Sequence, residues 1–266
     1  MKASKVIAIL AMVLMFLVGC ATSEEARQKA QIHLRLGTHH LTQGDSSSAL
    51  RELLEAEKLD PKDPHIRFAL GWAYSAKGRF SQALEQYQEV IKLDPKYTEA
   101  YNAMGATYLE MGKWDEAIES FQQALKDLLY LTPFYPLNNI GWAYYKKGDR
   151  RKAIEYYRRA LSQKPDFGLA HYNLGLAQKD EGKTEEAIAS FKAAVTHAPG
   201  LLDGHFQLGV LYFHSGKGEE AQKAFGEVLR LAPDSESARL AKQYLDLLKK
   251  PPRGSKQSPF LSGPKA

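Results

Sequence analysis

The chain has 266 residues, of which 44% are hydrophobic and 25% charged, and its formal net charge at pH 7 is +5. This is enough apolar material for a sizeable core. The charge excess is small, and nucleic-acid-binding proteins concentrate their basic residues on one face or in one run. Here basic and acidic residues are expected to interleave along every helix, which disfavours nucleic-acid binding. The single cysteine excludes an internal disulfide and any thiolate-rich metal site.

The first nineteen residues have the features of a secretory signal. Lys2 and Lys5 form a basic start, and residues 6–18 are thirteen uncharged apolar residues. A basic start, an apolar run of this length and a small residue before the cut describe such a signal, whereas a membrane-spanning helix needs about twenty residues. We predict that residues 1–19 are removed, which leaves a mature charge of +3 because two lysines are lost. The alternative is a short signal-anchor helix with a coincidental cysteine.

The sequence Leu-Val-Gly-Cys at residues 17–20 resembles the lipobox of bacterial lipoproteins. The resemblance implies that Cys20 becomes the first mature residue and carries a covalent lipid, while no other cofactor is expected. Three acyl chains, at about 0.8 kcal/mol per CH₂, would make the attachment effectively permanent. In bacterial lipoproteins an aspartate directly after the cysteine resembles a signal for retention in the inner membrane. Residue 21 is alanine here, so the resemblance implies a lipid anchor on the periplasmic face of the outer membrane. Residues 20–29 are then the acylated cysteine and a short tether.

A 34-residue period fills residues 30–235. One glycine series recurs at spacings of 34, 34, 36, 34 and 34 residues: Gly37, Gly71, Gly105, Gly141, Gly175 and Gly209. A second glycine follows each by seven residues, and alanine, aromatic and proline series follow in turn. This is the tetratricopeptide pattern, with two helices per repeat. We predict an all-α, right-handed superhelix of six helix-turn-helix repeats at 30–63, 64–97, 98–133, 134–167, 168–201 and 202–235.

The second repeat shows how one unit should fold. A first helix is expected over about 65–77, ended by Gly78 in the left-handed conformation. Ser81 is expected to be the N-cap of the second helix, and Pro95 should end that helix and hold Asp94 extended.

Packing of the repeat follows from its small and aromatic residues. Gly71 and Ala83 should be small because the two helices cross there, and Tyr74 and Tyr87 are expected to fill the space toward the next repeat. One repeat cannot bury this face alone, so neighbouring repeats must stack.

The remaining residues leave no room for a catalytic domain. Residues 236–250 have helical apolar spacing and are predicted to be a capping helix, and residues 251–266 are predicted to be disordered. No phosphate-binding loop, CxxC pair or HExxH is present. His33 and His40 lack acidic or cysteine partners at metal-ligand spacing, so we predict no metal site and no enzymatic activity.

The predicted binding surface is the concave groove of the superhelix. In tetratricopeptide proteins the second, fifth, ninth and twelfth residues of each first helix line this groove, and here they are mostly aromatic or apolar. Such a surface is typical of protein-binding sites. The candidate partner-binding residues are Phe68, Trp72, Asn102, Tyr135, Asn138, Trp142, Tyr145, Tyr172, Leu176, Phe206 and Phe213. The alternative for any one aromatic residue is a place in the core between repeats.

The 36-residue spacing carries the most specific resemblance. A lipobox, six repeats and the expanded segment from Asp127 through Tyr130 to Pro133 resemble the type IV pilus biogenesis and stability lipoproteins, the secretin pilotins. The resemblance implies a periplasmic scaffold or chaperone that binds a secretin subunit, contacts the membrane through its lipid, and binds neither nucleic acid nor a small substrate. The alternatives are an adaptor for periplasmic peptidases or peptidoglycan enzymes and a structural subunit of an envelope export complex.

Overall fold

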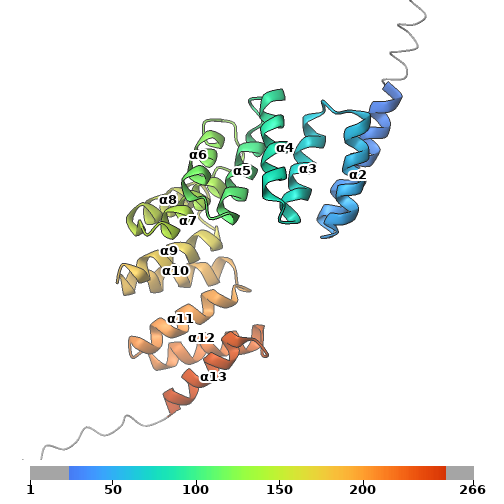
Figure 1. Ribbon diagram of the computed structural model, residues 1–266. Coiled ribbons are helices and arrows are strands. Elements are labelled where there is room, and N and C mark those ends of the chain that lie inside the picture. The colour runs from blue at the N-terminus through green and yellow to red at the C-terminus, as the bar shows by residue number, and fades with distance from the viewer. Residues whose placement is uncertain (1–23, 250–266) are drawn as a thin grey trace, which may run out of the picture. The chain divides into compact units, whose positions relative to one another are not determined.

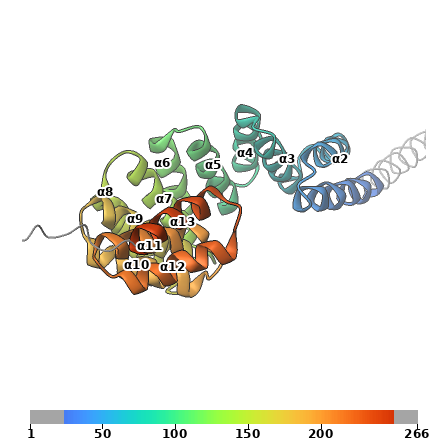
Figure 2. The same ribbon diagram turned by 90° about the horizontal axis from the view of Figure 1, so that it is seen from below.

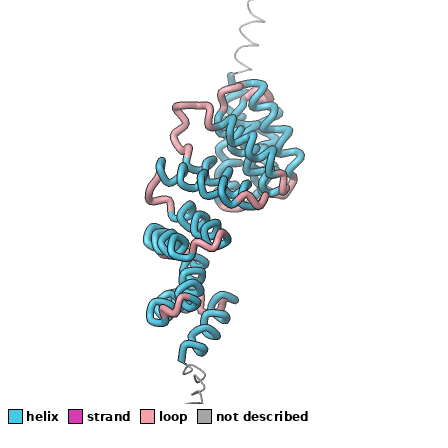
Figure 3. The backbone as a smooth tube through the Cα atoms, turned by 90° about the vertical axis from the view of Figure 1, so that its left-hand side faces the viewer, coloured by secondary structure: helices cyan, strands magenta, loops and turns pink. Residues whose placement is uncertain are grey.

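The computed structural model describes residues 24–249, and every regular element within that range is a helix (Figure 1). Figure 3 shows these helices joined by loops, without a strand in the coloured part of the chain. The predicted all-α fold class is therefore confirmed. The predicted signal, Cys20 and the predicted tail at 251–266 lie outside the described residues.

The helices fall into two compact units, Met1–Ala143 and Tyr144–Ala266, called here the first and second unit. After a helical segment at residues 24–42, the helices are α2 (Ser46–Leu59), α3 (Pro64–Ala76), α4 (Phe80–Leu93), α5 (Thr98–Glu110), α6 (Trp114–Ala124), α7 (Phe134–Lys146), α8 (Arg150–Gln163), α9 (Gly168–Asp180), α10 (Thr184–His197), α11 (Leu202–His214), α12 (Gly218–Leu231) and α13 (Glu236–Lys249).

Each repeat pairs a first helix, called A, with a second, called B. The A helices are the segment 24–42 and the odd-numbered helices α3 to α11, and the B helices are the even-numbered α2 to α12. In the first unit α3 packs on α4 and α5 on α6, and in the second unit α9 packs on α10 and α11 on α12. Within each unit neighbouring pairs also contact each other, as α4 does with α5 and α10 with α11.

A glycine in the A helix receives a large side chain from the B helix of the same repeat. A Cβ atom added at Gly71 would lie 2.4 Å from the Tyr87 ring, and one at Gly105 would lie 2.7 Å from Phe121. Tyr87 therefore packs inside its own repeat, where the missing Cβ leaves room for the ring, and not toward the next repeat as predicted. Tyr74 packs against the core cluster of the first two repeats, so its predicted direction was also wrong.

The turn between the two helices of a repeat depends on the second glycine series. All six of these glycines have φ between 70° and 90°, including Gly78, as predicted. The amide of Gly78 donates to Ser75 O and that of Arg79 to Tyr74 O, which is the bonding of a Schellman motif. The helix restarts at once, with Arg79 as the N-cap of α4 and no side-chain cap bond. The prediction that Ser81 is the N-cap was wrong, because the glycine turn already fixes where the helix begins.

The 36-residue spacing appears as a shortened helix and a long loop. α6 has 11 residues, whereas α4 and α8 each have 14. The chain between α6 and α7 is consequently a nine-residue loop, 125–133, compared with the four residues 94–97 between α4 and α5. In that shorter link Asp94 is extended, with φ −138° and ψ 96°, as predicted.

The ends of the described chain are helical. Residues 24–29, expected to be part of a tether, continue the first helix, and Lys29 forms an i,i+4 ion pair with Glu25 at 2.7 Å. At the other end α13 lies across α11 and α12 (Figure 2), and buries Ala238 and Ala241. Within residues 24–249 the helices are too short or too polar to cross a membrane.

Candidate functional site

In the first unit, α3 exposes a tryptophan beside a packed phenylalanine. Trp72 is 43% exposed, although its neighbours Leu70, Gly71 and Ala73 on α3 are buried. Phe68, one turn earlier, is half-buried, with its ring centroid 5.7 Å from that of Tyr87 and 5.3 Å from that of Tyr97. Phe68 therefore supports an apolar surface that Trp72 presents to solvent.

Two asparagines lie at the fifth position of A helices in the first unit. Asn102 of α5 has a buried Oδ1 atom with no hydrogen-bond partner among the described residues. Asn138 of α7 is buried, and its Nδ2 donates to Asn139 Oδ1 at 3.3 Å. A buried carbonyl oxygen without a donor is costly, but this atom is covered, so an incoming N–H group could reach it only after neighbouring side chains move.

The remaining candidates of the first unit lie on α7. Tyr135 is 48% exposed, and its ring centroid is 4.4 Å from that of Phe134. Trp142 is half-buried, so it exposes less of its ring than Trp72 does at the same repeat position. The exposed aromatic surface of the first unit is thus provided mainly by Trp72 and Tyr135.

In the second unit the candidate residues are more tightly held. The hydroxyl of Tyr145 donates to Asp180 Oδ2 at 2.7 Å, and burial together with this carboxylate raises the pKa of Tyr145 to about 12. The Arg150 guanidinium lies 4.7 Å from the same ring centroid. Tyr172 and Leu176 pack against the buried cluster of α10 to α13, and burial raises the pKa of Tyr172.

The capping helix covers the candidates of the last repeat. The Tyr244 ring centroid lies 5.0 Å from that of Phe213 and 6.4 Å from that of Phe206. Both phenylalanines belong to the core of α11, α12 and α13. Both are half-buried, so their contacts with Tyr244 help to hold the cap and leave only part of each ring for a partner.

The loop 125–133 is an exposed apolar surface that was not among the predicted binding residues. Leu128, Leu129 and Leu131 are 96%, 84% and 92% exposed. Asp127 anchors the loop, since its carboxylate accepts from Thr98 Oγ1 at 2.7 Å and from Leu129 N at 2.9 Å, and the Thr98 bond lowers the pKa of Asp127. A hollow of about 590 Å³ lies beside this loop. In the sequence, the 36-residue spacing between the third and fourth repeats indicated this longer loop.

The histidines form no metal site within residues 24–249, where no three metal-binding side chains converge. His33 Nδ1 lies 2.8 Å from Glu52 Oε2, and this contact lowers the pKa of Glu52.

Comparison with solved structures identifies close matches in fold. PilW, a widely conserved type IV pilus biogenesis factor, is 22% identical, with 80% of this chain and 98% of that chain covered and a TM-score of 0.72. PilF from Pseudomonas aeruginosa is 18% identical, with 83% and 98% covered and a TM-score of 0.71. MamA is 29% identical, with 64% and 92% covered and a TM-score of 0.54. The curated proteins contain no match to the sequence.

Sequence models of the tetratricopeptide repeat match residues 71–112, 97–166, 138–201 and 178–244. The likeness to PilW and PilF bears out the predicted resemblance to type IV pilus proteins at the level of the fold. Because the matches run without a break from residue 71 to residue 244, and the helix pairs recur with the same glycine turns, the chain belongs to the tetratricopeptide-repeat family.

Proposed function

We propose that this chain is a lipid-anchored scaffold that binds a segment of a protein partner on the A helices of its first unit. The observation that carries the proposal is the exposed Trp72 side chain above the packed Phe68. Tryptophan is rarely left exposed without a role, and it is among the residues that most often dominate binding energy. Asn102 Oδ1 adds a buried acceptor on the neighbouring A helix α5, which contacts α3.

The surface suits an extended or helical peptide better than a small molecule. Trp72 and Tyr135 offer broad aromatic faces for apolar side chains, and the buried Oδ1 of Asn102 can accept a main-chain N–H once neighbouring side chains move aside. Such a combination of aromatic anchors and a few directed polar groups is typical of peptide recognition. The protein would act by holding its partner, and no reacting group is assigned to it.

The proposed partner is a subunit of an outer-membrane secretin, and the proposed role is that of a pilotin in type IV pilus assembly. Two observations support this. One is the fold shared with PilW, a type IV pilus biogenesis factor, and the other is the expanded segment between the third and fourth repeats. A bound secretin segment would be shielded from aggregation and carried to the membrane by the lipid on Cys20.

Replacing Trp72 or Trp142 by alanine tests the binding surface. Each change should weaken the binding of a purified secretin subunit from the same organism by about 2 kcal/mol or more, the usual loss at a hot spot. Trp142 should have the smaller effect because it is half-buried. Binding is measured by titration calorimetry, and thermal melting of the same preparations shows whether the fold is intact.

Trp114→Ala is the matched control because this tryptophan is on a B helix, at the start of α6. It should leave binding unchanged. If Trp72→Ala melts like the unmodified protein and still binds the secretin with full affinity, the A-helix surface is not the site. The exposed leucines of the loop 125–133 would then be the next surface to mutate.

The proposed anchor predicts a different phenotype for Cys20→Ala. The variant should fold but remain unacylated, and it should leave the membrane fraction or stay attached by an uncleaved leader. Mass spectrometry of the N-terminus and fractionation of the envelope measure the two effects. An acylated variant in the outer membrane would contradict the assignment, because Cys20 is the only cysteine.

A further inference from the structure

The helix α8 differs in charge from every other B helix. It has five basic residues and one acidic residue, Glu155. The basic residues are Arg150, Arg151, Lys152, Arg158 and Arg159. The expectation that basic and acidic residues interleave along every helix is therefore wrong for α8, and the small net charge of the whole chain conceals this local excess.

Contacts within the chain account for only part of this charge: Arg150 Nη1 donates to Tyr145 O at 2.9 Å, and Lys152 Nζ lies 3.6 Å from the carboxylate of Asp149, the N-cap of α8. The N-terminal end of a helix favours negative charge and disfavours positive charge, by about 0.3–1 kcal/mol for each group. Three other B helices follow this rule, with acidic pairs in their first turns: Asp115 and Glu116 in α6, Glu185 and Glu186 in α10, and Glu219 and Glu220 in α12. At the same place α8 has three cations in succession and no acidic residue.

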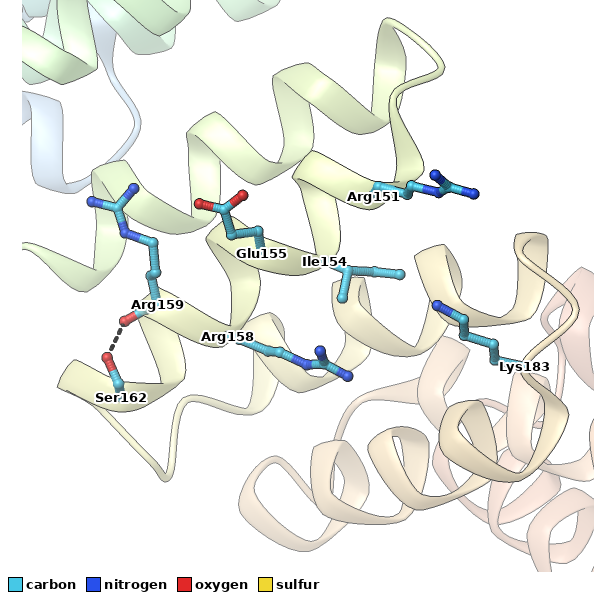
Figure 4. A pocket seen from close by; sticks show the side chains of 7 residues that line it. All are labelled: Arg151, Ile154, Glu155, Arg158, Arg159, Ser162 and Lys183. Atoms are coloured by element: carbon cyan, nitrogen blue, oxygen red, sulfur yellow. Dashed lines mark hydrogen bonds between the residues drawn. The ribbon is translucent and has the colours of Figure 1, made fainter.

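Some of these cations surround a hollow of about 470 Å³ between α8 and the start of α10. Figure 4 shows Arg151, Ile154 and Arg158 directed to one side of α8, with Lys183 reaching toward Ile154 from the start of α10. Glu155, Arg159 and Ser162 also line the hollow, which therefore has one carboxylate among its four cations. Ile154 is buried and forms the floor of the hollow.

The cations that face the hollow are available for a new partner. Arg158 Nη2 lies 3.2 Å from Glu186 Oε2, but both side chains are exposed, and such surface pairs contribute about 0–1 kcal/mol. Arg151 and Lys183 have no charged partner in the described part of the chain. Two other cations of α8 are held over rings, with Lys152 Nζ 5.0 Å from the Tyr144 centroid and Arg159, which also lines the hollow, 4.7 Å from that of Tyr156.

We infer that this groove binds an acidic helix of a protein partner. Arg151 and Arg158 are seven residues apart, which places them about 10 Å apart along the axis of α8. Two carboxylates seven residues apart on a second helix have the same spacing, and an apolar side chain between them would pack on Ile154. Guanidinium groups pair with carboxylates through two parallel hydrogen bonds, and Lys183 adds a third cation at the opposite wall.

A helix fits this surface better than the plane of a membrane does. The lining combines cations with the apolar Ile154, and a helix can match acidic side chains to the cations and an apolar side chain to Ile154, whereas lipid headgroups can match only the charge. The surface lies on a B helix of the second unit, whereas the proposed secretin-binding surface lies on A helices of the first. The inference therefore stands or falls independently of the proposed function.

The test uses a fluorescein-labelled, alanine-based helical peptide with two glutamates seven residues apart and a leucine between them. The purified chain should bind it in a fluorescence anisotropy titration, and a version with glutamine in place of glutamate should bind at least tenfold more weakly. Arg151→Glu with Arg158→Glu should lower affinity for the glutamate peptide at least tenfold and create affinity for a lysine version. This variant should fold, because Arg151→Glu gives α8 an acidic first turn like that of α10.

Arg35→Glu with Lys242→Glu is the control, because it makes the same change in net charge at exposed positions outside the groove. It should change the affinity for the glutamate peptide less than threefold, and Trp72→Ala should not change it. Equal losses in the control and the groove variant would overturn the inference, as would equal binding of the glutamate and glutamine peptides. Sedimentation with phosphatidylglycerol vesicles without peptide binding would also overturn it, and would assign the cations to a lipid surface.

Discussion

Replacing Tyr244 by alanine should lower the free energy of unfolding of the C-terminal repeats by about 2–4 kcal/mol, somewhat less than a fully buried aromatic residue would cost. The Tyr244 ring is stacked on Phe225, with centroids 5.1 Å apart and planes at 10°, and it meets Phe213 edge-on at 5.0 Å. Truncation leaves a cavity among rings that rigid helices hold in place. The capping helix would also lose its main contact with α11 and α12.

The effect should be local because repeat solenoids are stabilised by each repeat and its contacts with neighbours. Amide hydrogen exchange should therefore speed up in α11, α12 and α13 first, while α3 to α6 keep their protection. An equal increase in exchange rate over both units would contradict this expectation, because the cap would then stabilise the whole chain and not only the repeats next to it.

Leu247→Ala is the control, since Leu247 lies on the same helix and is 51% exposed. This substitution should change the free energy of unfolding by less than about 0.5 kcal/mol. Alanine does not lower helix propensity, so a loss as large as that from Tyr244→Ala would show that α13 depends on apolar contacts other than those of Tyr244 with Phe225 and Phe213.

The sequence predicted the backbone of each repeat better than the direction of its side chains. Gly78 had to adopt a left-handed conformation, and it does, because its role is set by the local chain. Tyr87 and Ser81 were misplaced for the opposite reason. The direction of Tyr87 depends on the space that Gly71 leaves on another helix, and the start of α4 depends on bonds made by the preceding turn.

Of the properties predicted from the sequence, the exposure of the candidate binding residues was predicted least well. Trp72 and Trp142 occupy the same repeat position, yet Trp72 is 43% exposed and Trp142 is half-buried. Phe213 fits the groove pattern equally well but lies against Tyr244. A repeat pattern places a residue on a face of its helix, whereas the side chains of neighbouring helices decide how much of it stays uncovered.

The first glycine series allows a test of how the A and B helices of a single repeat pack on each other. Gly209→Ala should lower the free energy of unfolding by about 1–3 kcal/mol, because the new Cβ would lie 2.7 Å from Phe225 Cε1. Gly226→Ala, next to Phe225 in sequence, should raise it by about 0.5–1 kcal/mol. Gly226 lies in the exposed middle of α12, with nothing within 4 Å of an added Cβ.

The two variants make the same chemical change in neighbouring helices, so helix propensity alone predicts a gain in stability for both. Only the close approach of the Phe225 ring to Gly209 predicts opposite signs. Urea unfolding of both variants, followed by circular dichroism, measures the difference, which we expect to be about 1.5–4 kcal/mol. The double variant Gly209→Ala with Phe225→Leu should recover part of the loss, because the smaller side chain leaves room for the Cβ. Without that recovery, the loss in Gly209→Ala would have to come from somewhere other than the contact with Phe225.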